Sequence, residues 1–263
     1  MQISLEGKVA IVTGVSGDGQ VGQAVDKALA ENGAQLAICA RTQSNVEARG
    51  KELRDAGARV FAMAGSLTDE DQVRRLIDDT VSEYGRIDIL VNLAGGLTRY
   101  KPAVEYSLDD WRVEVDNNLL SAFLTSRAAF PHLQAAGGGI IINFARAGQP
   151  QANMVAYNCA KAGLEALTRT LALEGRDLGQ STTRCCRAGP AHPSWPSDRG
   201  RTRNLRAGPD ASDSDDASQR VDVRPDGVEI NIRRCYLIEL LDAQSINPTT
   251  QGGANLTRNP RTF

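Results

Sequence analysis

The feature of this sequence that most constrains its fold is an alternation, over roughly the first 178 residues, of short apolar runs with longer amphipathic ones. Five short runs are nearly continuous in Val, Ile, Ala and Leu, as strands buried on both faces require. These runs span Lys8–Thr13, Gln35–Ala40, Arg59–Ala64, Ile87–Asn92 and Gly139–Phe144. The amphipathic segments between them are typical of crossover helices. The pattern predicts an α/β fold with a doubly wound parallel sheet.

Several helix boundaries can also be predicted. Capping-box patterns indicate two helix starts, and glycines after the last apolar residue indicate two helix ends. The residues are Thr68 with Asp71 and Ser107 with Asp110 at the starts, and Gly85 and Gly175 at the ends. The two longest amphipathic stretches cover about residues 109–133 and 154–174.

Composition narrows the cellular setting and the class of ligand. The net charge is −2 and the pI is about 5.8, so no basic field favours nucleic acid, and small molecules are the expected partners. Five cysteines without framework spacing favour a reducing compartment. The sequence shows neither a leader pattern nor an apolar run near the ~20 residues that span a bilayer. We therefore expect a soluble cytoplasmic protein, and no metal site is predicted.

The character of the sequence changes after residue 178. Seven of the ten prolines lie between Pro190 and Pro260, and twelve arginines follow from Arg184 onward. This composition predicts a domain of residues 1–178 followed by an atypical Arg/Pro/Ser-rich tail, 179–263, that is poorly ordered. Within the tail, residues 227–241 alone are apolar enough for an element of their own. A frameshift product and an unusual divergence both fit this composition.

A glycine-rich turn follows the first predicted strand and precedes the first predicted helix. It runs Thr13-Gly-Val-Ser-Gly-Asp-Gly-Gln-Val-Gly22. Glycines permit positive φ and close approach of the backbone, and a helix N-terminus favours an anion. The turn therefore predicts a site for the pyrophosphate of a dinucleotide.

Tyr157 and Lys161 form the second chemical feature. Four positions apart on a predicted helix, they share one face. A neighbouring cation favours the phenolate and lowers a tyrosine's pKa, which would let Tyr157 protonate a carbonyl oxygen. A solvated surface pair is the alternative interpretation.

These motifs, together with Asn92-Leu-Ala-Gly95, resemble the short-chain dehydrogenase/reductase family, including its 3-oxoacyl-reductase-like members, over about residues 5–178. The first turn is two residues longer than the family's, and Gln20 stands where the middle glycine would align unless Gly19 or Gly17 takes its place. The resemblance implies a Rossmann-like fold and a set of cofactor-binding residues. They are Gly14, Gly19, Val21, Gly22, Arg41, Ser66, Asn92, Ala94, Gly95, Tyr157 and Lys161.

The end of the second strand indicates which cofactor is preferred. An acidic residue there would bind the ribose 2′-hydroxyl of NAD, whereas a basic one would accept the 2′-phosphate of NADP. The sequence reads Cys39-Ala40-Arg41, so we expect NADP over NAD. Ser66 occupies the place of the family's adenine-contacting Asp.

The resemblance also implies a reaction. Tyr157 would be the general acid and base, Lys161 would lower its pKa and hold the nicotinamide ribose, and Asn118, seven residues after Trp111, would organise a water relay. The family's catalytic serine is absent, because Phe144, Ala145 or Arg146 holds its place, and Arg146 is a candidate substitute donor.

The predicted function is an NADP-dependent oxidoreductase that transfers a hydride between nicotinamide and a carbonyl or secondary alcohol. The missing serine leaves two alternatives open, a non-catalytic dinucleotide-binding protein and an inactive damaged gene product. The family resemblance suggests a homodimer or homotetramer built from the stretches at residues 109–133 and 154–174.

Overall fold

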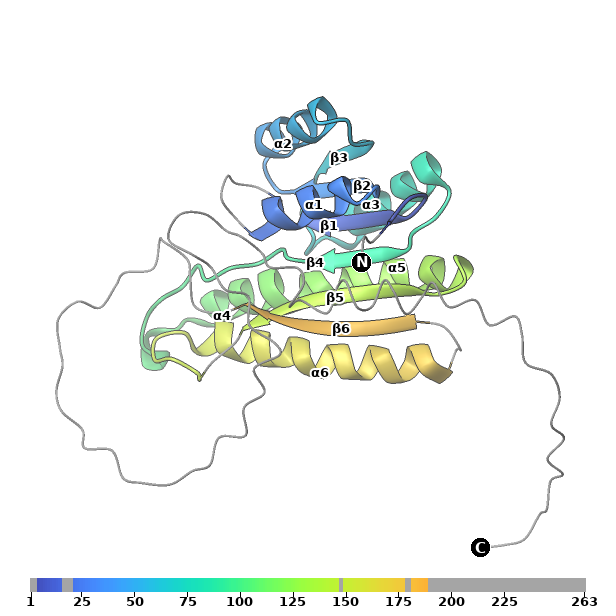
Figure 1. Cartoon of the computed structure of the whole chain (residues 1–263). Helices are drawn as coiled ribbons and strands as arrows, with labels where there is room; N and C mark the ends of the chain where they lie inside the picture. The colour runs from blue at the N-terminus through green and yellow to red at the C-terminus, as the bar shows by residue number, and fades with distance from the viewer. Residues whose placement is uncertain (1–3, 16–20, 147–148, 178–180, 189–263) are drawn as a thin grey trace, which may run out of the picture.

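The computed structural model of the chain describes residues 4–15, 21–146, 149–177 and 181–188. These residues form a parallel sheet with the strand order β3-β2-β1-β4-β5-β6 (Figure 1). The strands are β1 (Val9–Thr13), β2 (Gln35–Ala40), β3 (Val60–Ala64), β4 (Ile89–Asn92), β5 (Gly139–Arg146) and β6 (Ser181–Ala188). The order changes direction between β1 and β4, which confirms the predicted doubly wound, Rossmann-like class.

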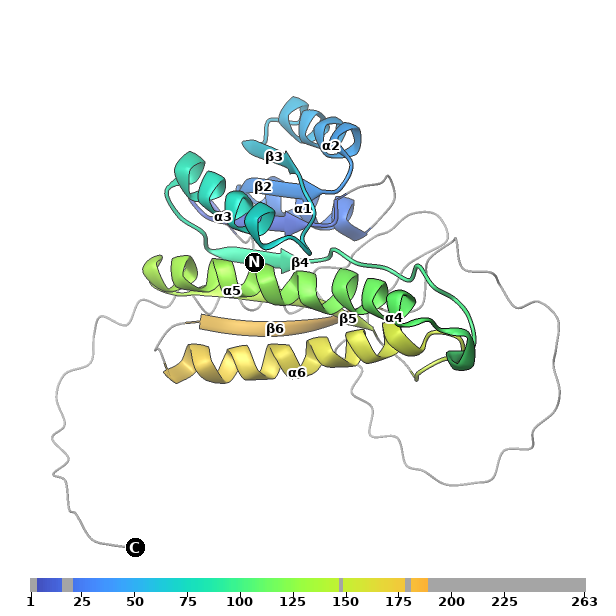
Figure 2. The same cartoon turned by 180° about the vertical axis from the view of Figure 1, so that it is seen from behind.

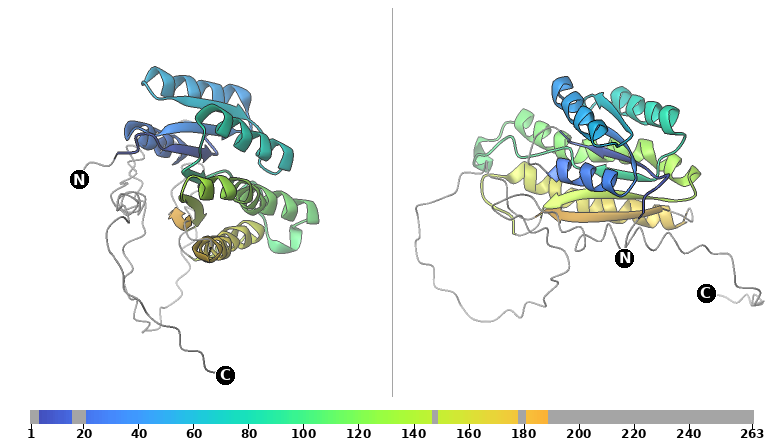
Figure 3. Two further views of the ribbon diagram at one scale, coloured as in Figure 1. Left: turned by 90° about the vertical axis from the view of Figure 1, so that its right-hand side faces the viewer. Right: turned by 45° about the horizontal axis from the view of Figure 1, so that its top comes forward.

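Helices cover both faces of this sheet. They are α1 (Val21–Glu31), α2 (Gln43–Asp55), α3 (Glu70–Tyr84), the 3₁₀ turn η1 (Ala103–Glu105), α4 (Leu108–Val115), the π turn η2 (Asp116–Leu120), α5 (Ser121–Ala135) and α6 (Val155–Asp177). Figure 1 has α1 in front of the sheet, and the reverse view in Figure 2 has α3 and α5 in front. The side view in Figure 3 shows α5 and α6 together on the face opposite α1. None of the helices described is both long and apolar enough to cross a membrane.

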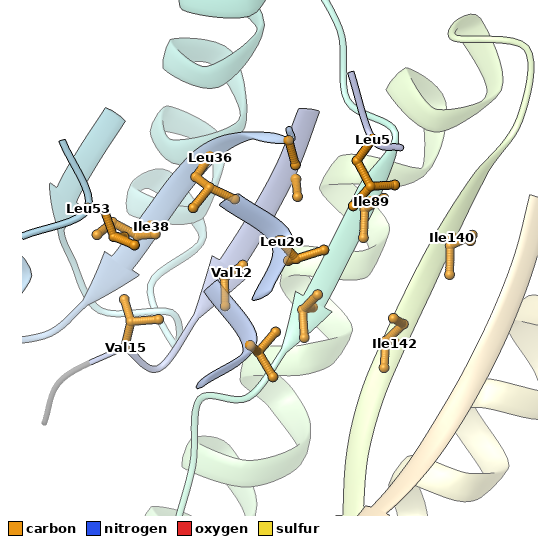
Figure 4. Packing of buried hydrophobic residues seen from close by; sticks show 14 of the residues in the cluster. Leu5, Val12, Val15, Leu29, Leu36, Ile38, Leu53, Ile89, Ile140 and Ile142 are labelled. Atoms are coloured by element: carbon orange, nitrogen blue, oxygen red, sulfur yellow. The ribbon is translucent and has the colours of Figure 1, made fainter. Parts of the chain in front are cut away.

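The core follows the two-residue period of the strands. Val12, Ile38 and Ile142 are buried on the face that α1 and α2 cover, and Figure 4 shows Leu53 next to Ile38 and Leu29 near Val12. The residues that alternate with this set along the strands, among them Ile11, Leu90 and Ile141, are buried on the face that α3 and α5 cover. Both faces of the sheet are buried, which explains why the strand sequences are nearly continuous apolar runs.

The predicted helix ends are confirmed at some positions and wrong at others. Ser107 and Asp110 form the expected capping box, and Gly85 ends α3 in the left-handed conformation at φ 78°. The start of α3 is capped by Asp69 rather than Thr68, because the Asp69 carboxylate accepts from the backbone N–H groups of Asp71 and Gln72. At the end of α6, the helix continues through Gly175 to Asp177, the last residue described there, so the predicted stop at Gly175 is wrong.

The predicted single helical stretch at 109–133 contains a π turn. Between α4 and α5 the backbone N–H of Ser121 bonds to the carbonyl oxygen of Asp116, five residues earlier. Such single π turns recur at functional sites. This one places Asn118 at its centre, and the Asn118 side chain is fully buried.

A sixth strand lies in the segment predicted as tail. β6 pairs in parallel with β5 from Gly139 opposite Ser181 to Arg146 opposite Ala188. The sequence analysis did not identify this strand, and the sheet extends past residue 178, where the domain was predicted to end. The rest of the predicted tail, residues 189–263, lies outside the described residues.

Candidate functional site

The carboxyl ends of β1 and β4 meet at the change in strand order, and two of the predicted glycines, Gly14 and Gly22, pack closely here. Gly14 follows β1 with φ 79°, and a Cβ on it would lie 2.7 Å from the backbone nitrogen of Ala94. A Cβ on Gly22 would lie 2.8 Å from the carbonyl oxygen of Gly14. Gly14 thus requires glycine for its conformation, and both positions require it for close backbone packing.

Thr13 holds these two strand ends together, a role that the sequence did not reveal. Its hydroxyl donates to the carbonyl oxygen of Val91 (3.2 Å) and accepts from the backbone N–H groups of Leu93 (3.1 Å) and Ala94 (3.2 Å). The hydroxyl therefore satisfies backbone groups where β4 stops pairing with β1. In the sequence, Thr13 is the last residue of the first predicted strand and directly precedes Gly14. A threonine at the end of a strand is common, so this position did not reveal its contacts with β4.

Of the other predicted cofactor contacts, Gly19 and its alternative Gly17 lie outside the described residues. Val21 begins α1 and packs against the core of the sheet. Arg41 is exposed immediately after β2, at the same edge as Gly14. Ser66 follows β3, and its hydroxyl lies 2.9 Å from that of Thr68.

Asn92, at the end of β4, belongs to a buried polar network. Its amide nitrogen donates to Ser126 (3.0 Å) and to Asn143 on β5 (2.9 Å), and its amide oxygen accepts from Thr125 (2.7 Å). Asn143 in turn donates to Thr168 on α6 (2.9 Å). The Asn92 side chain therefore connects β4 to β5 and α5, beneath the edge where Ala94 and Gly95 lie.

Asn118 binds the loop that follows β4. Its amide oxygen accepts from the backbone N–H of Gly96 (2.9 Å), and its amide nitrogen donates to the carbonyl oxygens of Gly96 (3.0 Å) and Glu114 (2.9 Å). Gly95 packs against this amide, because a Cβ there would approach the Asn118 oxygen to 2.5 Å. The structure thus brings Gly95 and Asn118 together, as the resemblance implied for one site.

Tyr157 and Lys161 share one face of α6. The Lys161 ammonium nitrogen lies 5.7 Å from the centroid of the Tyr157 ring and donates to the carbonyl oxygen of Phe144 (2.8 Å). Lys161 is buried, at 8% relative exposure, so it is not the solvated surface residue of the alternative interpretation.

The pKa of Tyr157 differs from the expectation. Burial raises it above the ordinary tyrosine value, the nearby Arg146 guanidinium lowers it, and the Glu114 carboxylate raises it further. Desolvation outweighs the favourable cation, because a phenolate loses more hydration energy than a neutral phenol. The pKa of Tyr157 in the protein chain therefore lies above the ordinary tyrosine value, whereas the sequence predicted a lowered one.

The three residues at the place of the missing serine point in different directions. Phe144 is buried in the core on the α1 face, and Ala145 packs with Ala122 and Leu164 on the opposite face. Arg146 ends β5 and donates to the carbonyl oxygen of Gln149 (2.7 Å). Since its charge acts on Tyr157, Arg146 is the polar member of the three that lies near the phenol.

Glu114 is a site residue that sequence reasoning missed. It lies one helical turn before Asn118, is fully buried, and accepts from the backbone N–H of Thr98 (2.6 Å). In the sequence, Glu114 is a charged residue in an amphipathic stretch, four positions before Asn118. Nothing in that pattern distinguishes a buried glutamate from a solvent-exposed one.

Comparison with known proteins agrees with this geometry. A family model described as short chain dehydrogenase matches residues 8–189, beyond the predicted boundary at 178. The chain is 38% identical over 184 residues to D-threitol dehydrogenase of Mycolicibacterium smegmatis, covering 68% of this chain and 69% of that one. It is 35% identical over 174 residues to L-fucose dehydrogenase of Oryctolagus cuniculus, covering 66% of this chain and 59% of that one.

Solved structures show the same likeness. A short chain dehydrogenase from Mycobacterium smegmatis superposes with a TM-score of 0.65 at 30% identity, covering 72% of this chain and 80% of that one. The chain spans roughly two thirds of the length of the curated relatives that it matches. On the family model and these relatives, the chain belongs to the short-chain dehydrogenase/reductase family.

Proposed function

We propose that this protein is an NADP-dependent oxidoreductase that interconverts a carbonyl group and a secondary alcohol, with Tyr157 as the general acid and base. The observation that carries the proposal is the pair on α6 formed by half-buried Tyr157 and buried Lys161, whose ammonium also donates to the carbonyl oxygen of Phe144 near the end of β5. Relatives named for the dehydrogenation of D-threitol and L-fucose support a substrate with a secondary alcohol.

The described residues fit a nicotinamide dinucleotide. The change in strand order between β1 and β4 is where open α/β sheets bind such ligands. A Cβ on Gly96 would meet no atom within 4 Å, so the backbone of this residue is open to close approach by a ligand. Arg41 is exposed at the end of β2, where its planar fork suits a 2′-phosphate. The cofactor, when bound, supplies or accepts the hydride.

The chain's own residues handle the proton and the orientation of the substrate. In reduction, the Tyr157 hydroxyl donates its proton to the carbonyl oxygen, and in oxidation the phenolate takes that proton back. Lys161 places a positive charge beside the phenol ring. Asn118 fixes the Gly95–Gly96 backbone next to α6, and Arg146 replaces the missing serine as a donor to the substrate oxygen.

A direct test separates binding from chemistry. We expect wild-type protein to bind NADPH more tightly than NADH by fluorescence titration and to reduce members of a carbonyl panel. Tyr157→Phe should bind NADPH as the wild type does but lose turnover by a factor of roughly 10²–10⁴, because the proton donor is gone. Cys159→Ser, an exposed substitution on the same helix, is the matched control and should leave both unchanged.

The second candidate is a dinucleotide-binding protein without turnover, favoured by Phe144, Ala145 and Arg146 at the serine's place. Tight NADPH binding with no turnover by the wild type would support it against the first proposal.

We also propose a cytoplasmic homodimer or homotetramer. Partly exposed Phe123 on α5 and Leu173 on α6 support an association through these helices.

A further inference from the structure

Glu114 holds a carboxylate that the proposed reaction does not use. Its relative exposure is 0%. One oxygen, Oε1, accepts from the backbone N–H of Thr98 (2.6 Å) and from the Thr98 hydroxyl. The other oxygen, Oε2, has no hydrogen-bond donor among the described residues.

A buried carboxylate oxygen without a donor is costly. Removing a charged acceptor from water without a replacement hydrogen bond is far less favourable than leaving a neutral group unpaired. Buried polar groups are therefore nearly always bonded, and each exception calls for an explanation. No cation of the described residues forms an ion pair with Glu114. Oε2 is therefore an atom of this site that is still able to accept a hydrogen bond.

The position of Glu114 indicates which donor could fit. Asn118 donates to the Glu114 carbonyl oxygen (2.9 Å), so the residue is fixed to the π turn and to the loop after β4. Asn118 binds Gly96 and Glu114 binds Thr98, two residues apart on that loop. The carboxylate is also close enough to Tyr157 for its charge to raise the pKa of the phenol. It therefore shares the neighbourhood of the proton donor.

We propose that Glu114 Oε2 accepts a hydrogen bond from a second hydroxyl of the substrate, on the carbon next to the one that reacts. This inference rests on the proposed function and names its substrate class, which is vicinal diols and the corresponding α-hydroxy ketones. A hydroxyl is a good donor to a carboxylate, whereas an acidic group at that carbon would be repelled. Thr98, which donates to the other carboxylate oxygen, is itself exposed, so one contact separates Glu114 from solvent.

The test compares matched alcohols that differ by one hydroxyl. The probes are cyclohexanol with cis-1,2-cyclohexanediol and 2-butanol with 2,3-butanediol, each assayed for oxidation with NADP⁺ and with NAD⁺. For the wild type, we expect kcat/KM to favour the diol by roughly 10- to 100-fold, as a hydrogen bond to a charged group implies. Glu114→Gln keeps an oxygen for Thr98 but presents an amide N–H₂ in place of Oε2, so the preference should fall to within about threefold.

The control is Asp109→Asn, which removes an exposed acid from the same helix, α4. It should keep the wild-type ratio. Because the readout is a ratio of two substrates for one variant, a general loss of activity or a changed Tyr157 pKa cancels.

Three outcomes overturn the inference, and they can be told apart. Wild-type turnover of both members of every pair with a ratio near one refutes it without any variant, even where Glu114→Gln fails to fold. A diol preference that persists in a folded Glu114→Gln shows that Glu114 has a structural role alone. No turnover of any alcohol by wild type that binds NADPH refutes the proposed function, and this inference with it.

Discussion

Arg146 ends β5 and lies close enough to Tyr157 for its positive charge to lower the pKa of the phenol. It is one of the three residues at the place of the missing serine, and the other two, Phe144 and Ala145, pack into cores on opposite faces of the sheet. The period of two along a strand would put Arg146 on the face of Phe144, so alternation by itself does not bring it to α6.

Removal of the Arg146 charge should change the pH dependence of oxidation. The base in that direction is the Tyr157 phenolate, whose pKa burial raises and Arg146 lowers. The value of kcat/KM for oxidation should therefore rise with pH into the alkaline range. In Arg146→Gln the rise should occur at higher pH still, and the loss of a donor should lower the plateau by roughly 10²–10³.

Arg146→Lys keeps the positive charge and is the matched comparison, so its pH profile should stay near that of the wild type. A profile in Arg146→Gln that coincides with the wild type would show that the guanidinium does not act on the phenol. Steady-state rates over a pH series in one mixed buffer measure both quantities.

Glu114 and Asn92 show a second limit at the residue scale. The sequence identified the glycines and the Tyr157–Lys161 pair because their spacing is local. The bonds from Asn92 to Asn143 and from Glu114 to Thr98 join residues that are far apart in the chain. Residue type and local spacing do not predict such partners.

Helices of this protein were easier to predict than their ends. The apolar period of α3 is clear, but its start is shifted by one residue because Asp69, rather than Thr68, accepts the first free N–H groups. Both residue types cap helices, so the sequence allowed either. The π turn at Asp116–Leu120 could not be predicted from the local sequence pattern, because its central residue, Asn118, is hydrogen-bonded to Gly96 in a distant loop.

The cap of α3 yields a prediction about stability and pH. Asp69→Ala should lower the melting temperature by about 2–4 °C at neutral pH, because the cap is lost. Asp69→Asn should keep most of the stabilisation that the cap provides, because Asn also caps helices. The hydrogen bond to Gln72 holds the pKa of Asp69 below its ordinary value. The carboxylate's contribution is therefore complete above the unfolded pKa and is lost as pH falls through the folded one.

Melting curves from neutral to acidic pH test this. The advantage of wild type over Asp69→Ala should shrink as the solution is acidified, while that of Asp69→Asn should persist. An advantage of wild type that is constant with pH would contradict the assignment of the cap to the ionised Asp69.

At the scale of the molecule, the fold class followed from the alternation of apolar and amphipathic segments, and the five predicted strands are all present. β6 could not be predicted, because Ser181-Thr-Thr-Arg-Cys-Cys-Arg-Ala188 lacks an apolar run. Its position comes from parallel pairing with β5, a tertiary contact that overrides local preference.

Two truncated chains test the contribution of β6. A chain that ends at residue 188 keeps all the strands of the described residues and both large core clusters, so we expect it to melt cooperatively, within a few degrees of the full chain. A chain that ends at residue 178 loses β6 and leaves the backbone groups of β5 unpaired along one side. It should melt at a clearly lower temperature, and equal melting of the two would show that β6 adds nothing.

The position of β6 also bears on how this protein would behave when concentrated. In the described part of the chain, β6 ends the sheet, and its outer row of peptide groups pairs with no further strand. An edge of eight residues is long enough to recruit a strand from another molecule. Handling of the purified protein should therefore be limited by ordered self-association along this edge, with light scattering rising with concentration at temperatures where the helices are still intact.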